Sequence, residues 1–172
     1  MKWILVAVGS LALLVAVVAV IGALLPKAHL ASRWIVLKKT PREVYAVISD
    51  TADAPGWRHD LKKIEILPPV NGLKCFRETG AHGAITYVVI EDRPGELFVS
   101  KIADENLPFG GQWTFEFASA GAGTRLRLTE DGEVRNVIFR FVARYIFGHA
   151  ASIEGYLRDL GKKLGEPIEP QG

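Results

Sequence analysis

The chain has 172 residues, of which 49% are hydrophobic, and a formal net charge of +2. This length suits one domain or at most two small ones, and the weak charge argues against a nucleic-acid-binding protein. The single cysteine, Cys75, excludes an intramolecular disulfide. The apolar residues are concentrated near the N-terminus, and from Lys27 onward they make up about 43% of the chain, an ordinary soluble composition. A polytopic membrane protein, a disordered chain and a disulfide scaffold are therefore disfavoured.

An uncharged, strongly apolar segment begins at Trp3 and ends at Leu25. A helix of this length measures about 35 Å, enough to cross a hydrocarbon core of about 30 Å. The segment is longer than the apolar region of a signal peptide and lacks a small-residue cleavage site. We therefore predict a transmembrane anchor over residues 1–26, which places the protein in a membrane with a single span. More basic residues follow the span than precede it, and this asymmetry favours a cytoplasmic domain.

The pattern after a linker at 27–32 predicts one domain over residues 33–166 and a polar tail over 167–172. A strand at 33–39 precedes a short helix, whose start is marked by Thr40 at the N-cap and Glu43 three residues later. A second short helical piece begins near Ala54. Strands joined by short turns follow, as in an antiparallel meander. They are expected at residues 64–67, 73–78, 84–91, 96–103, 112–118 and 124–134.

The last predicted element is one long helix over residues 136–164. A small domain covers such a helix only if its sheet curls around it, so we expect an α+β fold with a curved antiparallel sheet. A gap between sheet and helix suits a small hydrophobic ligand. The candidate cavity-lining residues are Trp113, Phe115, Phe141, Tyr145 and His149.

The first half of this helix is apolar on nearly every side and carries arginines between its aromatic residues. One interpretation is that this half lines the cavity while Arg135, Arg140 and Arg144 extend toward solvent. The other is a basic amphipathic surface that lies on the bilayer beside the anchor. The two interpretations are compatible.

From about residue 25 to 166 the chain resembles the START-like (SRPBCC) superfamily, with its polyketide cyclase/dehydrase and lipid-transport members. The matching segments are residues 40–45, 50–57, 107–113, 123–126, 130–132, 139–141 and 156–160. The resemblance implies a helix-grip fold with a deep hydrophobic cavity. It also implies binding of lipids, sterols, polyketides, hormones or quinones, with catalysis in a minority of members.

No convergent catalytic or metal-binding set is evident. Arg58, His59 and Asp60 form a titratable cluster, but adjacent helical residues point about 100° apart, so His59 and Asp60 are not expected to face one another. The four histidines lack the spacing of metal ligands. We therefore expect neither a metal nor a cofactor, and we expect Cys75 to be a core residue.

Three further groups, Glu78, His82 and Glu130, could converge as acid and base across the strands. The face that each side chain occupies is not fixed by strand parity alone, and the simpler interpretation is that they are solvated turn residues.

These observations favour a membrane-tethered, non-catalytic domain that binds a lipid, quinone or polyketide-like molecule. A cyclase or aromatase is the first alternative, and it requires an acid–base group inside the cavity. The second is an interaction module with a collapsed cavity that serves an envelope partner. The sequence identifies no protein partner.

Overall fold

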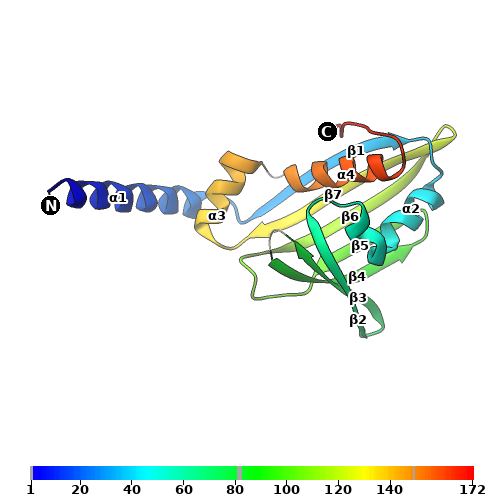
Figure 1. Ribbon diagram of the computed structural model, residues 1–172, viewed down its shortest axis with the longest axis horizontal. Helices are drawn as coiled ribbons and strands as arrows, with labels where there is room; N and C mark the ends of the chain where they lie inside the picture. The colour runs from blue at the N-terminus through cyan, green and yellow to red at the C-terminus, as the bar shows by residue number, and fades with distance from the viewer. Residues whose placement is uncertain (1, 81–82, 149) are drawn as a thin grey trace.

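The computed structural model describes residues 2–80, 83–148 and 150–172. A long helix, α1 (Lys2–Leu24), projects from a domain built on one seven-stranded antiparallel sheet, as Figure 1 shows. The strand order is β1-β7-β6-β5-β4-β3-β2. Strands β2 to β7 therefore form the predicted meander. The last strand of the meander, β7, pairs with β1, which forms the other edge of the sheet. This arrangement confirms the α+β fold with a curved antiparallel sheet.

The strands extend somewhat beyond the predicted limits. Residues 28–32, expected in the linker, form the first half of β1 and pair with β7. Strand β2 continues through Pro68 and Pro69, which were expected to end it, because an edge strand tolerates residues without an N–H donor. In the expected tail, Gln171 pairs with Trp34. The strands are β1 (Ala28–Leu37), β2 (Leu61–Val70), β3 (Leu73–Gly80), β4 (Gly83–Arg93), β5 (Leu97–Ile102), β6 (Phe109–Ala120) and β7 (Gly123–Val134).

Two short helical elements connect β1 to β2. Helix α2 (Pro41–Ser49) begins with the predicted capping box: Thr40 accepts from the Glu43 N–H at 3.4 Å, and the Glu43 carboxylate accepts from the Thr40 N–H at 2.8 Å. The 3-10 helix η1 (Thr51–Gly56) follows directly. Both elements lie over the sheet, next to its concave side (Figure 1).

The prediction of one continuous C-terminal helix is wrong. The structure has helix α3 (Val137–Val142), a single π-helical turn η2 (Ala143–Phe147), and helix α4 (Ala151–Lys163). Gly148 ends the π-helical turn with φ 76°, a left-handed conformation that favours glycine and cannot continue a right-handed helix. The two halves of the expected helix consequently pack in different places.

The hydrophobic core lies between the sheet, α2 and α4. On α4, Ile153, Leu157 and Leu160 recur at spacings of three and four residues and are fully buried, so they form one apolar stripe that faces the core. They share one core cluster with Leu126 and Leu128 of β7. Cys75 is also buried, as expected. Helix α4 therefore occupies the concave side of the sheet. Helix α3 contacts α1 at one end of the domain, and α2 lies at the other end (Figure 1).

Candidate functional site

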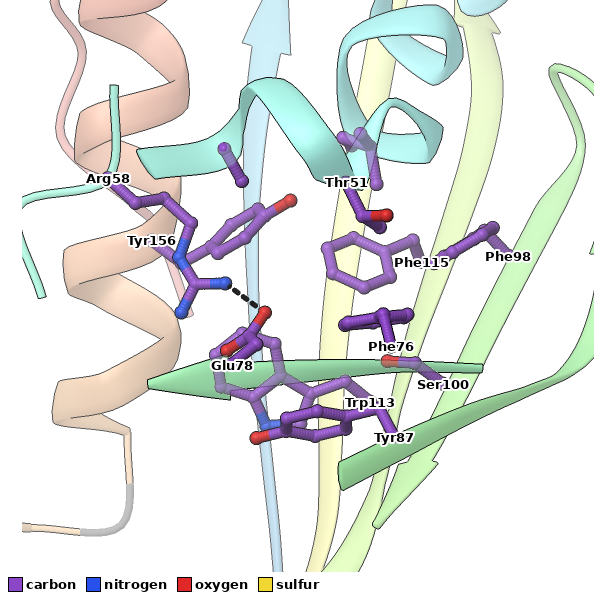
Figure 2. A pocket seen from close by; sticks show the side chains of 12 residues that line it. Thr51, Arg58, Phe76, Glu78, Tyr87, Phe98, Ser100, Trp113, Phe115 and Tyr156 are labelled. Carbon is purple, nitrogen blue, oxygen red and sulfur yellow. Dashed lines mark hydrogen bonds and ion pairs between the residues drawn. The ribbon is translucent and has the colours of Figure 1, made fainter. Parts of the chain in front are cut away.

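A small cavity lies between the sheet, η1 and α4, and Figure 2 shows the side chains around it. Its volume is about 30 Å³. The lining side chains come from α2, η1, the turn after η1, four neighbouring strands and α4. They are Ile48, Thr51, Ala54, Arg58, Phe76, Glu78, Tyr87, Phe98, Ser100, Trp113, Phe115 and Tyr156.

Six of the twelve side chains that line the cavity are aromatic. Tyr156 of α4 is at their centre, with its ring centroid 5.5 Å from Trp113 and 5.3 Å from Phe115. On the other strands, Phe76 stacks on Tyr87 at 5.4 Å. Alternate residues of a strand point to one face, so Trp113 and Phe115 of β6 project together toward α4. This wall offers flat, apolar surfaces to a ligand.

A buried ion pair occupies the other side of the cavity. The Arg58 guanidinium donates to Glu78 at 2.6 Å, and these two side chains are only 7% and 14% exposed. Arg58 also donates to Asp60 through Nε and Nη2, at 3.2 and 2.8 Å. The same guanidinium lies 5.2 Å from the centre of the Tyr156 ring, a cation–π contact. Figure 2 shows the pair beside Tyr156, between η1 and the sheet.

The ionisable groups in the cavity have shifted pKa values. Burial raises the pKa of the Glu78 carboxyl above its ordinary value, although the neighbouring Arg58 opposes this shift. Burial also raises the pKa values of the Tyr87 and Tyr156 hydroxyls, so both stay protonated at neutral pH. The cavity thus combines a carboxylate, a guanidinium and two phenols with an aromatic wall. These groups can hydrogen-bond a polar substituent of an otherwise apolar molecule.

The structure separates the five predicted cavity-lining residues. Trp113 and Phe115 line the cavity, and their role in binding a ligand stays a prediction. Phe141 and Tyr145 are not among the lining residues: they belong to α3 and the π-helical turn, with ring centroids 5.0 Å apart. The break at Gly148 is the physical reason, because it turns this half of the expected helix toward α1. His149 lies outside the described residues.

Glu78 and Glu130 take separate places instead of converging. The expectation that Glu78 is a solvated turn residue is wrong, since it lies inside the cavity. Glu130 accepts from Trp113 Nε1 at 3.1 Å and from Ser152 Oγ at 2.8 Å, and it contacts His29. It therefore fixes the edge of the Trp113 ring. The third member of the predicted group, His82, lies outside the described residues.

His59 pairs with a residue that the sequence did not suggest. Its backbone N–H donates to Asp159 of α4 at 2.9 Å, and its ring Nδ1 contacts the same carboxylate. Within the described residues, His59, Asp60 and Asp159 place possible metal-ligand atoms within 4.8 Å of one another. However, Arg58 already binds Asp60, and Lys162 lies 3.6 Å from Asp159. These cations balance the negative charges of the two carboxylates, so the cluster is accounted for by ion pairs within the protein.

One sequence signal could have placed Glu78 in the cavity. Glu78 is two residues from Phe76 on β3, and such residues share a face of the sheet. Assigning the aromatic Phe76 to the concave face would have brought Glu78 with it. Arg58 and Tyr156 had no comparable local signal, because their contacts join segments far apart in the chain.

A family model described as polyketide cyclase / dehydrase and lipid transport matches residues 29–164. No curated protein sequence matches the chain. Among solved structures, a START superfamily protein from Mycobacterium smegmatis is 16% identical with a TM-score of 0.64, covering 80% of this chain and 97% of the other. The Zhui aromatase/cyclase from Streptomyces sp. R1128 is 15% identical with a TM-score of 0.62, covering 80% and 94%. Norcoclaurine synthase from Thalictrum flavum is 12% identical with a TM-score of 0.62, covering 81% and 87%. At these identities the solved structures establish the shared fold.

Proposed function

We propose that the domain binds a small apolar molecule in the aromatic cavity. The chain belongs to the polyketide cyclase/dehydrase and lipid-transport family, and the proposal starts from this membership. The observation that carries the proposal is the aromatic wall around Tyr156, facing one buried ion pair. Aromatic surfaces with a few polar groups are typical of small-molecule sites. A lipid, a quinone or a polyketide-like molecule with one hydrogen-bonding substituent fits this chemistry.

Ligand entry requires the cavity to widen. Its volume of about 30 Å³ holds about one water molecule, whereas a pocket for a drug-sized ligand has about 300–1,000 Å³. The short 3-10 helix η1 and the turn after it, which contains Arg58, cover the cavity on one side. Both contain few residues. Their displacement from the sheet is therefore the simplest route to a larger pocket.

The N-terminal helix supports a location at a membrane. Among the described residues, α1 is long and apolar enough to cross a bilayer by length and composition, and it is exposed along nearly all of its length. We propose that it anchors the domain where apolar ligands partition, with the domain on the cytoplasmic side as the excess of basic residues after the span favours.

The experiment is native mass spectrometry and lipid extraction of the full chain purified from membranes. We expect a co-purifying apolar molecule that is lost in Ser100→Val, because the added methyl groups fill the cavity near Trp113. Ala122→Val is the matched control, since Ala122 is exposed in the β6–β7 turn and lies outside the cavity. A chain that is repeatedly free of ligand, and whose melting temperature does not respond to lipid panels, would contradict the proposal.

A second candidate function is catalysis on a hydrophobic substrate, as in a cyclase or aromatase. The observation that favours it is Glu78, a carboxyl group with a raised pKa inside the cavity and close to protonated tyrosines. The name of the Zhui aromatase/cyclase points to the same class. Glu78→Gln distinguishes the two functions: it retains ligand binding if the site only binds, and it abolishes turnover if Glu78 transfers a proton. The absence of both ligand and turnover would leave an interaction module with a collapsed cavity.

A further inference from the structure

Helix α1 joins the domain without a flexible connection. It ends at Leu24 and β1 begins at Ala28, so only a few residues lie between them. Within this connection, the Lys27 carbonyl accepts from the Val134 N–H at 2.8 Å, which ties it to the end of β7. The direction of α1 is therefore set by the domain.

Gly22 allows α3 to pass directly against α1. Gly22 is buried, and a Cβ atom at this position would lie 2.0 Å from the Val137 carbonyl oxygen. Only a residue without a side chain permits this approach of two backbones. Gly9, near the other end of the helix, has no atom within 4 Å of the same position. The contact between α1 and α3 is thus confined to the end of α1 nearest the domain.

The Arg140 side chain caps the C-terminal end of α1. This residue is 7% exposed, and its Nη1 donates to the carbonyls of Gly22 and Leu25, both at 3.1 Å. Its Nη2 donates to the Arg135 carbonyl at 3.1 Å. The carbonyls in the last turn of a helix lack hydrogen-bond donors within that helix and carry partial negative charge. The Arg140 guanidinium supplies both the donors and a positive charge.

Three large apolar side chains of α3 and of the π-helical turn are exposed. Phe139, Tyr145 and Ile146 are 50%, 60% and 65% exposed. Phe139 belongs to α3, and Tyr145 and Ile146 belong to the π-helical turn that continues it. The basic residue Arg144 is also exposed within the same stretch. We call this set of four residues the α3 surface.

We infer that the α3 surface lies in the interfacial layer of the membrane beside the point where α1 enters the bilayer. This inference rests on the proposed anchoring by α1 and extends it to a second contact. Figure 1 shows α3 next to the domain end of α1, where an inserted anchor would meet the lipid headgroups. Exposed aromatic and aliphatic side chains with a neighbouring arginine suit this layer, because they bury apolar atoms and leave the charge among the headgroups.

The docking of α3 on α1 makes this a fixed geometry. An anchor on a flexible linker would let the domain rotate freely, whereas the Gly22 and Arg140 contacts hold the α3 surface at one level relative to the span. The domain would therefore have one orientation on the bilayer.

The test is depth-dependent quenching of a fluorophore on the full chain in phosphatidylcholine/phosphatidylglycerol vesicles. Single cysteines for the label are introduced by Ile146→Cys, Leu13→Cys and Ala122→Cys in a Cys75→Ala background. Leu13 is in the middle of α1, and Ala122 is in the β6–β7 turn at the far end of the domain (Figure 1). We expect spin-labelled lipids to quench the Ile146 label most strongly at a shallow position, about 5–10 Å deep. The Leu13 label is quenched by deep positions, and the Ala122 label only by aqueous iodide.

The outcomes distinguish a failure of the contact between the α3 surface and the membrane from a failure of the α1 anchor. Quenching by lipid at Leu13 but not at Ile146 would overturn the inference and leave the anchor intact. Quenching by lipid at Ile146 but not at Leu13 would contradict the span, and it would overturn the inference that the α3 surface lies beside an inserted anchor. An Ile146 label shielded from both lipid and iodide would mean that a protein, either a partner or a second copy, covers the surface, which overturns the inference. Free access of iodide to the labels at Leu13 and Ile146 would overturn the anchor and the inference together.

Discussion

Among the residues that the structure describes, two arginines are buried, Arg58 and Arg140, and their charges are compensated in different ways. Arg58 binds two carboxylates: Glu78, which lines the cavity with it, and Asp60, which lies outside the lining. Arg140 donates to three backbone carbonyls where α1 meets α3. An ion pair requires both partners to be present, whereas the carbonyls at a helix end are supplied by the backbone itself. The cavity should therefore respond strongly to charge changes, and the α1–α3 junction to changes of shape.

The largest effect is expected for Arg58→Met. The substitution leaves Glu78 buried without its cation, and breaking a buried pair from one side costs about 3–5 kcal/mol of the free energy of unfolding. The double variant Arg58→Met/Glu78→Leu should recover much of this loss, because it removes both charges. Denaturant unfolding in detergent, monitored by tryptophan fluorescence, measures both values. A loss below about 1 kcal/mol, typical of exposed pairs, would show that the pair is solvated.

A smaller effect is expected for Arg140→Met. The variant removes the donors to the Gly22 and Leu25 carbonyls, and losing hydrogen bonds from a charged group costs about 1.5–3 kcal/mol. No carboxylate is stranded, so a second substitution that neutralises an acidic residue should not restore stability. Hydrogen exchange should become faster in α3 while α4 stays protected. Uniformly faster exchange would contradict a local role for Arg140.

Gly22→Ala tests the shape of the same junction. The added Cβ would lie 2.0 Å from the Val137 carbonyl oxygen, so α3 must move away, at a cost of about 1–3 kcal/mol. Gly9→Ala is the matched control, because its Cβ has no neighbour within 4 Å and alanine favours the helix. Protease cleavage in residues 137–147 of the vesicle-bound chain should rise for Gly22→Ala alone. Equal cleavage of both variants would show that α3 does not depend on this contact.

Local patterns predicted the cap and the hairpins, but long-range contacts decided the site. The Thr40 capping box depends on residues three positions apart. The turn between β2 and β3 depends on two adjacent residues, Asn71 and Gly72, which both have positive φ. The Arg58–Glu78 pair instead depends on which face of β3 is concave. The all-round apolar pattern of residues 138–147 predicts a cavity wall, a surface that lies on the bilayer, or both, and it does not decide between them. The structure shows that α1 covers part of it, and an isolated Gly148 gave no decisive sign of the break.

The smallest effect concerns the pH dependence of stability in Glu78→Gln. Because the pKa of Glu78 is raised in the folded protein, the folded state binds this proton more tightly than the unfolded state. The contribution of Glu78 to stability is therefore most favourable below the ordinary pKa of about 4.3 and declines as the pH rises through the folded-state value. Asp60 and Asp159 act in the opposite direction: their pKa values are lowered, and their contributions are lost as the pH falls.

The difference between the wild-type chain and Glu78→Gln isolates the carboxyl group from these opposing aspartates. We expect the stability of the wild type relative to the variant to fall as the pH rises above the ordinary carboxyl pKa of about 4.3, because the raised pKa of Glu78 favours its protonated form in the folded protein. The Arg58 cation remains in both proteins and is held by Asp60, so the variant should stay folded. Denaturant unfolding from about pH 4 upward, with Glu116→Gln as an exposed control on β6, gives the measurement. A relative stability that rises with pH would mean that the attraction of Arg58 outweighs burial, and Glu78 would then be a permanently charged partner of Arg58, unsuited to proton transfer.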